Sequence, residues 1–257
     1  MDILQSIIIG IVEGITEFLP ISSTAHMVLA SKVLGIAQTD FVKSFEIVIQ
    51  FGAILSVVVL YWKKFILDME SLKRVMAAFI PTAVVGFVLY KVIKTVLLGS
   101  TGVIVWALLL GGVFIILFEM LHREKDDAHE DISTIPYSKC VWIGLFQAIA
   151  VIPGVSRSAA TVIGGLLLGL KRTTIVEFSF LLAVPTMLAA SVLDLAKSGS
   201  SFTSDQFLVL AAGFAVSFVV ALLSIKFLLG FVKKHTFISF GVYRIIIALA
   251  FIAGMYF

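Results

Sequence analysis

The sequence has 257 residues, of which 60% are hydrophobic and 14% are charged, with a formal net charge of +3. Its mean hydropathy of +1.14 is far above that of a soluble domain. The small positive charge is spread over connecting segments, so nucleic acid is not expected as a partner. Cys140 is the single cysteine, which excludes an intrachain disulfide and a thiolate metal cluster.

Apolar runs follow one another along the chain, several of them near the roughly 20 residues that a helix needs to cross the bilayer. They do not alternate between apolar and polar residues, as strands of a membrane barrel would. The sequence therefore predicts an all-α polytopic integral membrane protein in a lipid bilayer. Its predicted spans are 44–62, 75–98, 101–121, 176–195, 206–228 and 237–257.

The segment 10–35 matches the segment 144–169 at a constant separation of 134 residues. Each copy reads as an apolar helix, a proline-containing break, a hydroxyl-rich turn and a second apolar helix that ends at glycine. Three predicted spans follow each copy. We therefore expect a single membrane domain made of two repeats, 1–121 and 140–257, joined by a charged cytoplasmic linker at 122–139.

The helices beside Pro20 and Pro153 are short for full spans, and each proline interrupts the backbone hydrogen-bond ladder. Each copy is therefore predicted to be a re-entrant helical hairpin. Three full spans per repeat is an odd number, so the second repeat must enter the membrane inverted. Inverted repeats with broken helices commonly hold their site near the midplane, where the repeats meet.

Basic residues predict the orientation, because the side richer in lysine and arginine is usually cytoplasmic. Both termini and the mouth of the first hairpin are then expected outside. On the richer side lie Lys63, Lys64, Lys73, Arg74, Arg123, Lys125, Lys139, Lys171, Arg172, Lys226, Lys233 and Lys234, and on the other side lie Lys32, Lys43, Lys91, Lys94 and Lys197.

The first hairpin contains "EGITEFLPISSTAH" (13–26), in which Glu13 and Glu17 lie four residues apart and so share one face of a helix. Two carboxylates there repel each other unless a cation lies between them. Mg²⁺ typically takes one or two carboxylates and completes its shell with water and phosphate oxygens. The pair is therefore a candidate metal site, and the alternative is that it lines a wet vestibule.

The turns of both hairpins are rich in hydroxyls, with Ser22, Ser23 and Thr24 in the first, and Ser156, Ser158 and Thr161 in the second. Hydroxyls at helix starts often serve only as caps. However, if the two tips meet, two helix N-termini point partial positive charge at one place. We expect an anion site there, with these hydroxyls as phosphate-binding groups.

Arg157 stands between two serines in an otherwise apolar stretch. An unpaired guanidinium costs several kcal/mol in a membrane, and its fork matches phosphate oxygens. The alternative is a salt bridge to Glu13 or Glu17 that fastens the hairpins together. His26, one turn after Ser23, is a candidate general base, nucleophile or acid, and its alternative is a plain hydrogen bond.

Four other polar residues carry weaker signals. Glu46 and Gln50, again four residues apart, are candidates for a second layer around the site. Arg244 and Lys226 are expected to snorkel toward nearby loop ends.

Taken together, these motifs resemble the bacterial undecaprenyl-pyrophosphate phosphatase family, which is linked to bacitracin resistance. "EGITEFLPISSTAH" is similar to its glutamate-rich signature and "PGVSRSAAT" to its serine-arginine signature. The resemblance spans the whole chain. It implies divalent-metal-dependent hydrolysis of the C55 isoprenoid diphosphate to its monophosphate, which recycles the lipid carrier of envelope polymers, at a site on the outer face of the cytoplasmic (inner) membrane.

The family's functional residues are carried over by position. Its glutamates fall on Glu13 and Glu17, its histidine on His26, its hydroxyls on Ser23 and Thr24, and its second-motif pair on Ser156 and Arg157. Ala25 and Ala159 stand where the family often has glycine. Their methyl groups are expected to narrow phosphate access at the hairpin tips.

The resulting hypothesis has Glu13 and Glu17 hold Mg²⁺ or Ca²⁺ against the diphosphate, while Arg157 neutralises charge on the transferred phosphoryl group. Ser23, His26 and water remain open as nucleophile. The rival hypothesis is a transporter or flippase for a polyprenyl phosphate lipid, because inverted repeats with hairpins are also a transporter architecture. Whether the chain forms a homodimer stays open.

Overall fold

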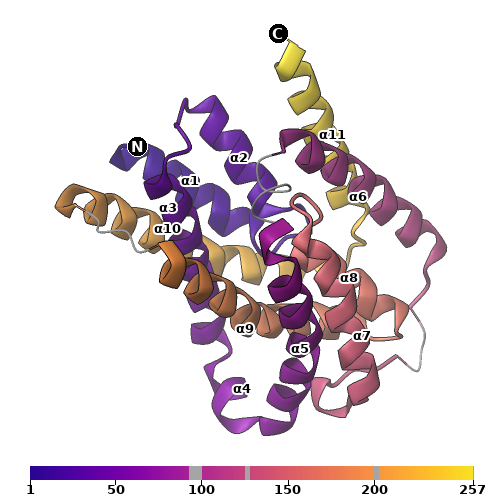
Figure 1. Ribbon diagram of the computed structural model, residues 1–257. Helices are drawn as coiled ribbons and strands as arrows, with labels where there is room; N and C mark the ends of the chain where they lie inside the picture. Colours follow the sequence, from indigo (N-terminus) through magenta and orange to yellow (C-terminus); the bar gives the residue numbers. More distant parts are fainter. Residues whose placement is uncertain (93–99, 125–127, 199–202, 257) are drawn as a thin grey trace.

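The computed structural model describes residues 1–92, 100–124, 128–198 and 203–256, and its regular elements are helices (Figure 1). Within these ranges, β pairing is limited to a single bridge between His129 and Leu170. The all-α prediction is confirmed. The helices are α1 (Ile3–Thr16), α2 (Ser23–Val33), α3 (Asp40–Leu60), α4 (Trp62–Leu67), α5 (Met69–Val92), α6 (Thr101–Leu121), α7 (Tyr137–Ala148), α8 (Arg157–Leu167), α9 (Arg172–Ser198), α10 (Ser204–Val232) and α11 (Ile238–Tyr256), with short 3-10 turns at Ile132–Thr134 and Ile149–Val151.

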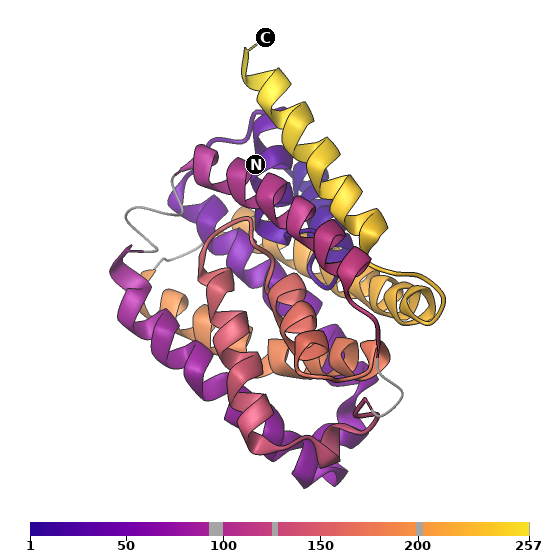
Figure 2. The ribbon, with the colours of Figure 1, turned by 90° about the vertical axis from the view of Figure 1, so that its right-hand side faces the viewer.

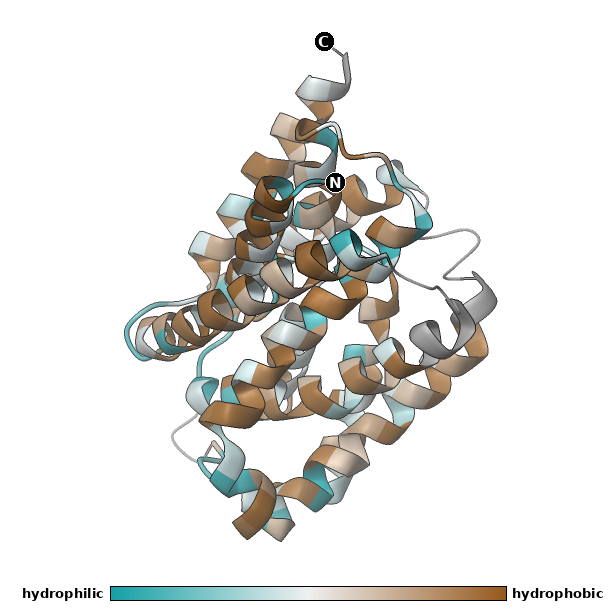
Figure 3. Ribbon diagram, turned by 90° about the vertical axis from the view of Figure 1, so that its left-hand side faces the viewer, coloured by the Kyte–Doolittle hydropathy of each residue, from teal (hydrophilic) through white to brown (hydrophobic). Residues whose placement is uncertain are grey.

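Five of the described helices are long and apolar enough to cross a membrane, namely α3, α5, α6, α9 and α10. The sixth predicted span corresponds to α11, whose apolar stretch Ile238–Gly254 is shorter. Figure 3 shows hydrophobic residues along most of the helices and hydrophilic residues mainly in loops and at helix ends. The chain is thus a multi-pass membrane protein. Residues 93–98 and 257 of the predicted spans, and 125–127 of the predicted linker, lie outside the described residues.

Both predicted hairpins consist of a helix, a break and a second helix. In the first, α1 ends at Thr16 and α2 begins at Ser23, and Pro20 lies between them. In the second, α7 continues into a 3-10 turn before Pro153, and α8 begins at Arg157. Proline supplies no backbone donor and interrupts the helical ladder at both breaks, although α5 and α9 continue past Pro81 and Pro185.

Residues 134 positions apart adopt the same backbone conformation in the two hairpins. Ser22 and Ser156, at the starts of α2 and α8, have φ angles of 71° and 76° and are the non-glycine residues with positive φ in the described ranges. Gly35 and Gly169, just after α2 and α8, have φ angles of 63° and 79°. These matching φ angles are expected if the two hairpins are copies of one structural repeat. The inverted orientation of the second copy stays a prediction.

The hairpin of each half packs against a long helix of the other half. Helix α1 lies on α10, and α7 lies on α5. Close approach requires glycine at both contacts. A Cβ atom added at Gly10 would lie 2.7 Å from the carbonyl oxygen of Gly213, and one added at Gly144 would lie 2.0 Å from the carbonyl oxygen of Ala78. The prolines of both breaks, Pro20 and Pro153, are buried in the bundle.

Helices α6 and α11 form a third pair, and they lie side by side in Figure 2. Gly112 on α6 and Gly241 on α11 allow this contact, because a Cβ atom at either position would lie less than 3 Å from the backbone carbonyl oxygen of the other. The pair places the middle of α11 beside the breaks of the two hairpins, to which Arg244 is hydrogen-bonded. In Figure 1 both termini lie toward the upper end of the molecule and α4 toward the lower end.

Candidate active site

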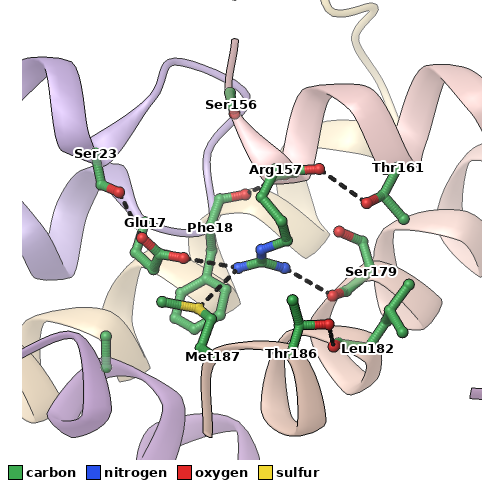
Figure 4. Close-up of polar contacts among 12 residues, drawn as sticks. Glu17, Phe18, Ser23, Ser156, Arg157, Thr161, Ser179, Leu182, Thr186 and Met187 are labelled. Atoms are coloured by element: carbon green, nitrogen blue, oxygen red, sulfur yellow. Dashed lines mark hydrogen bonds and ion pairs between the residues drawn. The ribbon is translucent and has the colours of Figure 1, made fainter. Parts of the chain in front are cut away.

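The two hairpins meet at the Glu17 carboxylate (Figure 4). Its Oε2 accepts a hydrogen bond of 2.5 Å from the Ser23 hydroxyl, and its Oε1 accepts one of 2.8 Å from Nη2 of Arg157. Ser23 is the first residue of α2 and Arg157 is the first residue of α8. The first residues of α2 and α8 therefore contact one carboxylate through their side chains, and the anion site expected there stays a prediction.

The Arg157 guanidinium is only partly satisfied by these contacts. Nη1 donates to the Ser179 carbonyl oxygen at 2.8 Å, Nη2 also approaches the Met187 sulfur at 3.7 Å, and the group lies 5.8 Å from the centre of the Phe18 ring. The ion pair with Glu17, anticipated as the alternative role of Arg157, is therefore present. Nε of Arg157 and the Ser179 hydroxyl are buried without a partner in the described structure, so donors remain for a ligand.

Glu13 lies one helical turn before Glu17 and is fully buried. Neither of its carboxylate oxygens has a hydrogen-bond partner among the described residues. Among the described residues, the charged side chains of Glu17, Glu46 and Arg157 act on it electrostatically. An isolated buried carboxylate is strongly unfavourable, so this position calls for a cation or a proton.

The Glu13 carboxylate has the ligand chemistry for a divalent metal ion, whereas both Glu17 oxygens already accept hydrogen bonds from Ser23 and Arg157. The described residues contain no cluster of three or more histidine, cysteine, aspartate or glutamate side chains arranged for a metal. A site with two protein carboxylates suits Mg²⁺ or Ca²⁺ only when water and phosphate oxygens complete the shell. The unpartnered oxygens of Glu13 supply the required ligand chemistry, and Glu17 shares its face of the hairpin.

The other predicted hydroxyl residues differ in the contacts that they make. Ser158 donates to the Phe18 carbonyl oxygen at 2.7 Å and so ties the second hairpin to the break of the first. The Ser156 hydroxyl accepts from the Ala159 N–H as a helix cap, whereas Ser22 makes no side-chain cap. Thr24 is partly exposed. Their phosphate-binding role stays a prediction.

His26 is held at both ring nitrogens. Nδ1 lies 2.8 Å from the Ser22 carbonyl oxygen, which can only accept, so Nδ1 carries the proton. Nε2 lies 3.0 Å from the Tyr243 hydroxyl, and the two rings are nearly parallel with centres 5.5 Å apart. In the neutral ring, Nε2 is therefore the basic atom, and Tyr243 covers it.

Arg244 contradicts its sequence prediction. It does not snorkel but is fully buried, and it donates to five backbone carbonyl oxygens. The prediction is wrong because the irregular backbone of both hairpin breaks leaves carbonyl groups that need donors inside the bundle. Lys226 is exposed, as snorkelling requires. The five acceptors of Arg244 belong to Pro20, Ala107, Leu108, Gly154 and Val155.

Three residues of the site were thus missed by sequence reasoning, namely Ser179, Tyr243 and Arg244. A signal existed only for Arg244, which is the one charged residue of the predicted span 237–257. Ser179 and Tyr243 belong to apolar helices whose sequence does not show what they face. Their part in the site depends on how α9 and α11 pack against the hairpins.

Two further expectations concern residues around the site. Glu46 on α3 accepts from the Ser31 hydroxyl on α2 at 3.4 Å, behind the first hairpin. Ala25 is fully buried among apolar side chains of α6 and α11, and Ala159 is buried in the main apolar core. Their methyl groups therefore fill the core, which contradicts the expectation that they narrow phosphate access.

Comparisons with known proteins show the family of this chain. The model of the family described as "Bacitracin resistance protein BacA" matches residues 6–250. An undecaprenyl-diphosphatase of Aquifex aeolicus (strain VF5) is 53% identical over 249 residues, which cover 97% of either chain. Undecaprenyl-diphosphatases of Sulfurihydrogenibium sp. (strain YO3AOP1) and Bdellovibrio bacteriovorus are 51% and 48% identical, covering 98% and 100% of this chain and 98% and 97% of their own lengths.

Proposed function

We propose that this chain, which belongs to the bacitracin resistance protein BacA family, hydrolyses undecaprenyl diphosphate to undecaprenyl phosphate and inorganic phosphate. The family membership confirms the resemblance seen in the two hairpin motifs. The reaction recycles the lipid carrier used for peptidoglycan and other envelope polymers, and it confers bacitracin resistance. A multi-pass membrane protein meets this substrate in the bilayer where the isoprenoid tail dissolves.

The observation that carries this proposal is the convergence of both hairpins on Glu17. One carboxylate binds a hydroxyl at the start of α2 and a guanidinium at the start of α8. A diphosphate arriving between the two helix N-termini finds N–H groups, the fork of Arg157 and its unpartnered Nε. These groups bind negative charge and stabilise the charge that develops on the transferred phosphoryl group.

Glu13 and Glu17 are the residues that would hold a divalent cation, Mg²⁺ or Ca²⁺. Bound there, such an ion supplies charge neutralisation for the diphosphate. The unpartnered oxygens of Glu13 support this assignment, because its carboxylate has no partner within the described chain.

Among the three candidate nucleophiles, the geometry favours Ser23. Its hydroxyl already donates to Glu17 at 2.5 Å, so its proton can pass to that carboxylate as the Ser23 oxygen bonds to the terminal phosphorus. The bond to the bridging oxygen breaks, and undecaprenyl phosphate leaves. Water then attacks the phosphorus of the phosphoserine, the bond to the Ser23 oxygen breaks, and inorganic phosphate leaves. Glu17 returns its proton to the Ser23 oxygen, and Nε2 of His26 exchanges its hydrogen bond with Tyr243 for the proton of the water.

The test is phosphate release by the purified protein in detergent with undecaprenyl diphosphate and Mg²⁺. Glu17→Gln should reduce the rate by at least about 100-fold, because it removes the acceptor of Ser23 and the charge that orients Arg157. Glu70→Gln, at a surface carboxylate that pairs with Lys73 and Arg74, is the control and should act as wild type. Wild-type rates in Glu17→Gln would refute the carboxylate assignment.

The nucleophile has its own test. Rapid quenching with phosphate-labelled lipid should trap label on the protein, and peptide mapping should place it on Ser23. Label on His26 would assign the histidine instead. Full activity of both Ser23→Ala and His26→Ala would exclude both covalent routes and leave water.

A flippase for polyprenyl phosphate remains a second candidate, because the hairpin of each half packs on the other half as in repeat-built transporters. A flippase alone releases no phosphate in detergent, so the same assay separates the two.

We also propose that both termini and the mouth of the first hairpin face outward. An epitope tag at either terminus should then be cleaved by protease added to spheroplasts.

A further inference from the structure

Arg244 joins the breaks of both hairpins to α6. Its guanidinium contacts the carbonyl oxygens of Pro20 at 3.3 Å in the first break, and of Gly154 and Val155 at 2.8 and 2.9 Å in the second. It also reaches Ala107 and Leu108 of α6 at 2.9 and 3.3 Å. One side chain therefore bonds to three segments that are far apart in the sequence.

Irregular backbone inside a membrane protein is tolerated only where its polar groups are satisfied by the protein. Arginine suits this task, because its five donors lie in a rigid planar fork and keep fixed directions. Helix α6 makes room for the fork at Gly111, where a Cβ atom would lie 2.2 Å from Nη2 of Arg244. The spacing of the two breaks is thus set by a rigid group in a fitted space.

The preceding residue, Tyr243, contacts the catalytic side of the first hairpin. Its hydroxyl is 3.0 Å from Nε2 of His26, and its ring is parallel to the imidazole with an interplanar angle of 5°. Together with the Ser22 carbonyl oxygen at Nδ1, the hydroxyl fixes both the tautomer and the tilt of the ring. Tyr243 and Arg244 are consecutive on α11, so one helix turn contacts both hairpins.

We propose that α11 is the positioning element of this active site: Arg244 sets the spacing of the two hairpin tips through their carbonyl oxygens, and Tyr243 sets the orientation of the His26 ring. The inference rests on the proposed phosphatase function, because it assigns how the groups of that reaction are held. Tyr243 and Arg244 act through other residues and are positioning residues.

The proposed role of Tyr243 in orienting His26 is tested by a double-mutant cycle that measures phosphate release. Tyr243→Phe keeps the ring and removes one hydrogen bond, so kcat should fall about tenfold while KM changes less than about twofold. In a His26→Ala background, whose residual rate is measured with radiolabelled lipid, Tyr243→Phe should have no further effect. An equal fold loss in both backgrounds, or a rise in KM with unchanged kcat, would overturn the role of Tyr243.

The Arg244 arm is tested without removing the arginine, which protects the fold. Gly111→Ala drives a methyl group into the guanidinium and should lower kcat by at least about tenfold with Arg244 still present. Gly102→Ala, on the same helix, is the matched control, because its Cβ would approach only the Ser100 hydroxyl at 3.9 Å. It should behave as wild type. As a second variant, Arg244→Lys keeps the charge but not the planar fork, and it should also lower kcat.

Wild-type activity separates the two proposals. If wild type releases no phosphate, the proposed function fails. If wild type is active and both Tyr243→Phe and Gly111→Ala match it, the function stands and the positioning role of α11 is refuted. Loss of activity in Gly111→Ala with a monodisperse, folded protein and an unchanged Gly102→Ala supports it.

Discussion

The two hairpins treat one buried polar position in opposite ways. Glu13 on α1 and Gln147 on α7 lie 134 residues apart, at matching places in the two copies. Both carboxylate oxygens of Glu13 lack a partner among the described residues. Gln147, in contrast, donates to the hydroxyls of Thr82 and Thr186 at 3.1 Å each and accepts from Thr161 at 3.1 Å.

The difference comes from the surroundings of the two side chains. The three threonines around Gln147 correspond, at the same separation of 134 residues, to residues without a hydroxyl group, namely Met27, Gly52 and Val216. The second hairpin thus satisfies its own buried amide, while the first leaves its carboxylate to an external partner. In natural proteins, a buried polar group without a hydrogen-bond partner is found mainly at functional sites.

The largest effect is expected when Glu13 of the first hairpin is replaced by glutamine, the residue at the matching position 147 of the second. Glu13→Gln should lower phosphate release by at least about 100-fold, because the amide cannot hold a divalent cation by charge. Without divalent ions, its unfolding midpoint in detergent should rise by a few degrees, about 1 kcal/mol, since no buried charge remains. Added Mg²⁺ should stabilise wild type and not this variant. If Glu13→Gln releases phosphate at the wild-type rate, the functional role of Glu13, and with it this difference between the hairpins, is refuted.

A smaller effect on activity, and a larger one on stability, is expected in the second hairpin. Gln147→Leu breaks three hydrogen bonds but leaves each threonine hydroxyl its bond to a backbone carbonyl oxygen, so unfolding should become easier by about 1–3 kcal/mol. The folded variant should keep its rate within about threefold. Thermal unfolding followed by circular dichroism, with the phosphate assay, measures both. If Gln147→Leu loses activity as fully as Glu13→Gln, the second hairpin is not merely a scaffold.

The smallest effect concerns the two serines with positive φ. Ser22→Gly relieves a strained conformation and should raise stability by about 1 kcal/mol or less. Ser156→Gly relieves the same strain but loses the cap to the Ala159 N–H, which costs a few tenths of a kcal/mol. Ser22→Gly should therefore stabilise more than Ser156→Gly in thermal unfolding. The reverse order would show that the cap of α8 contributes little.

Much of the fold could be predicted because its signals are local. Hydropathy marks the long helices, and Pro20 and Pro153 mark the hairpin breaks. The candidate residues Glu17, Ser23 and Arg157 were chosen because polar groups in apolar helices are unfavourable unless they have a use. The structure brings these three into direct contact.

The prediction for Arg244 failed for an equally physical reason. Its distance from a loop along the chain suggested snorkelling, but the packing of α11 on α6 buries it. The acceptors of its hydrogen bonds are carbonyl groups, which every residue has and which no side-chain pattern reveals. Tyr243 gave no signal, since its partner His26 lies 217 residues away in the sequence.

By itself, the sequence determined that this chain is a bundle of membrane helices with two broken hairpins, and that the first hairpin carries carboxylates while the second brings an arginine. Those properties follow from hydropathy and from the chemistry of each side chain. Only the tertiary structure decided that both helix N-termini meet at Glu17, that Gln147 is satisfied where Glu13 is not, and that Arg244 holds both tips. These contacts join residues up to 224 positions apart, and only the packing of the helices brings them within hydrogen-bond distance.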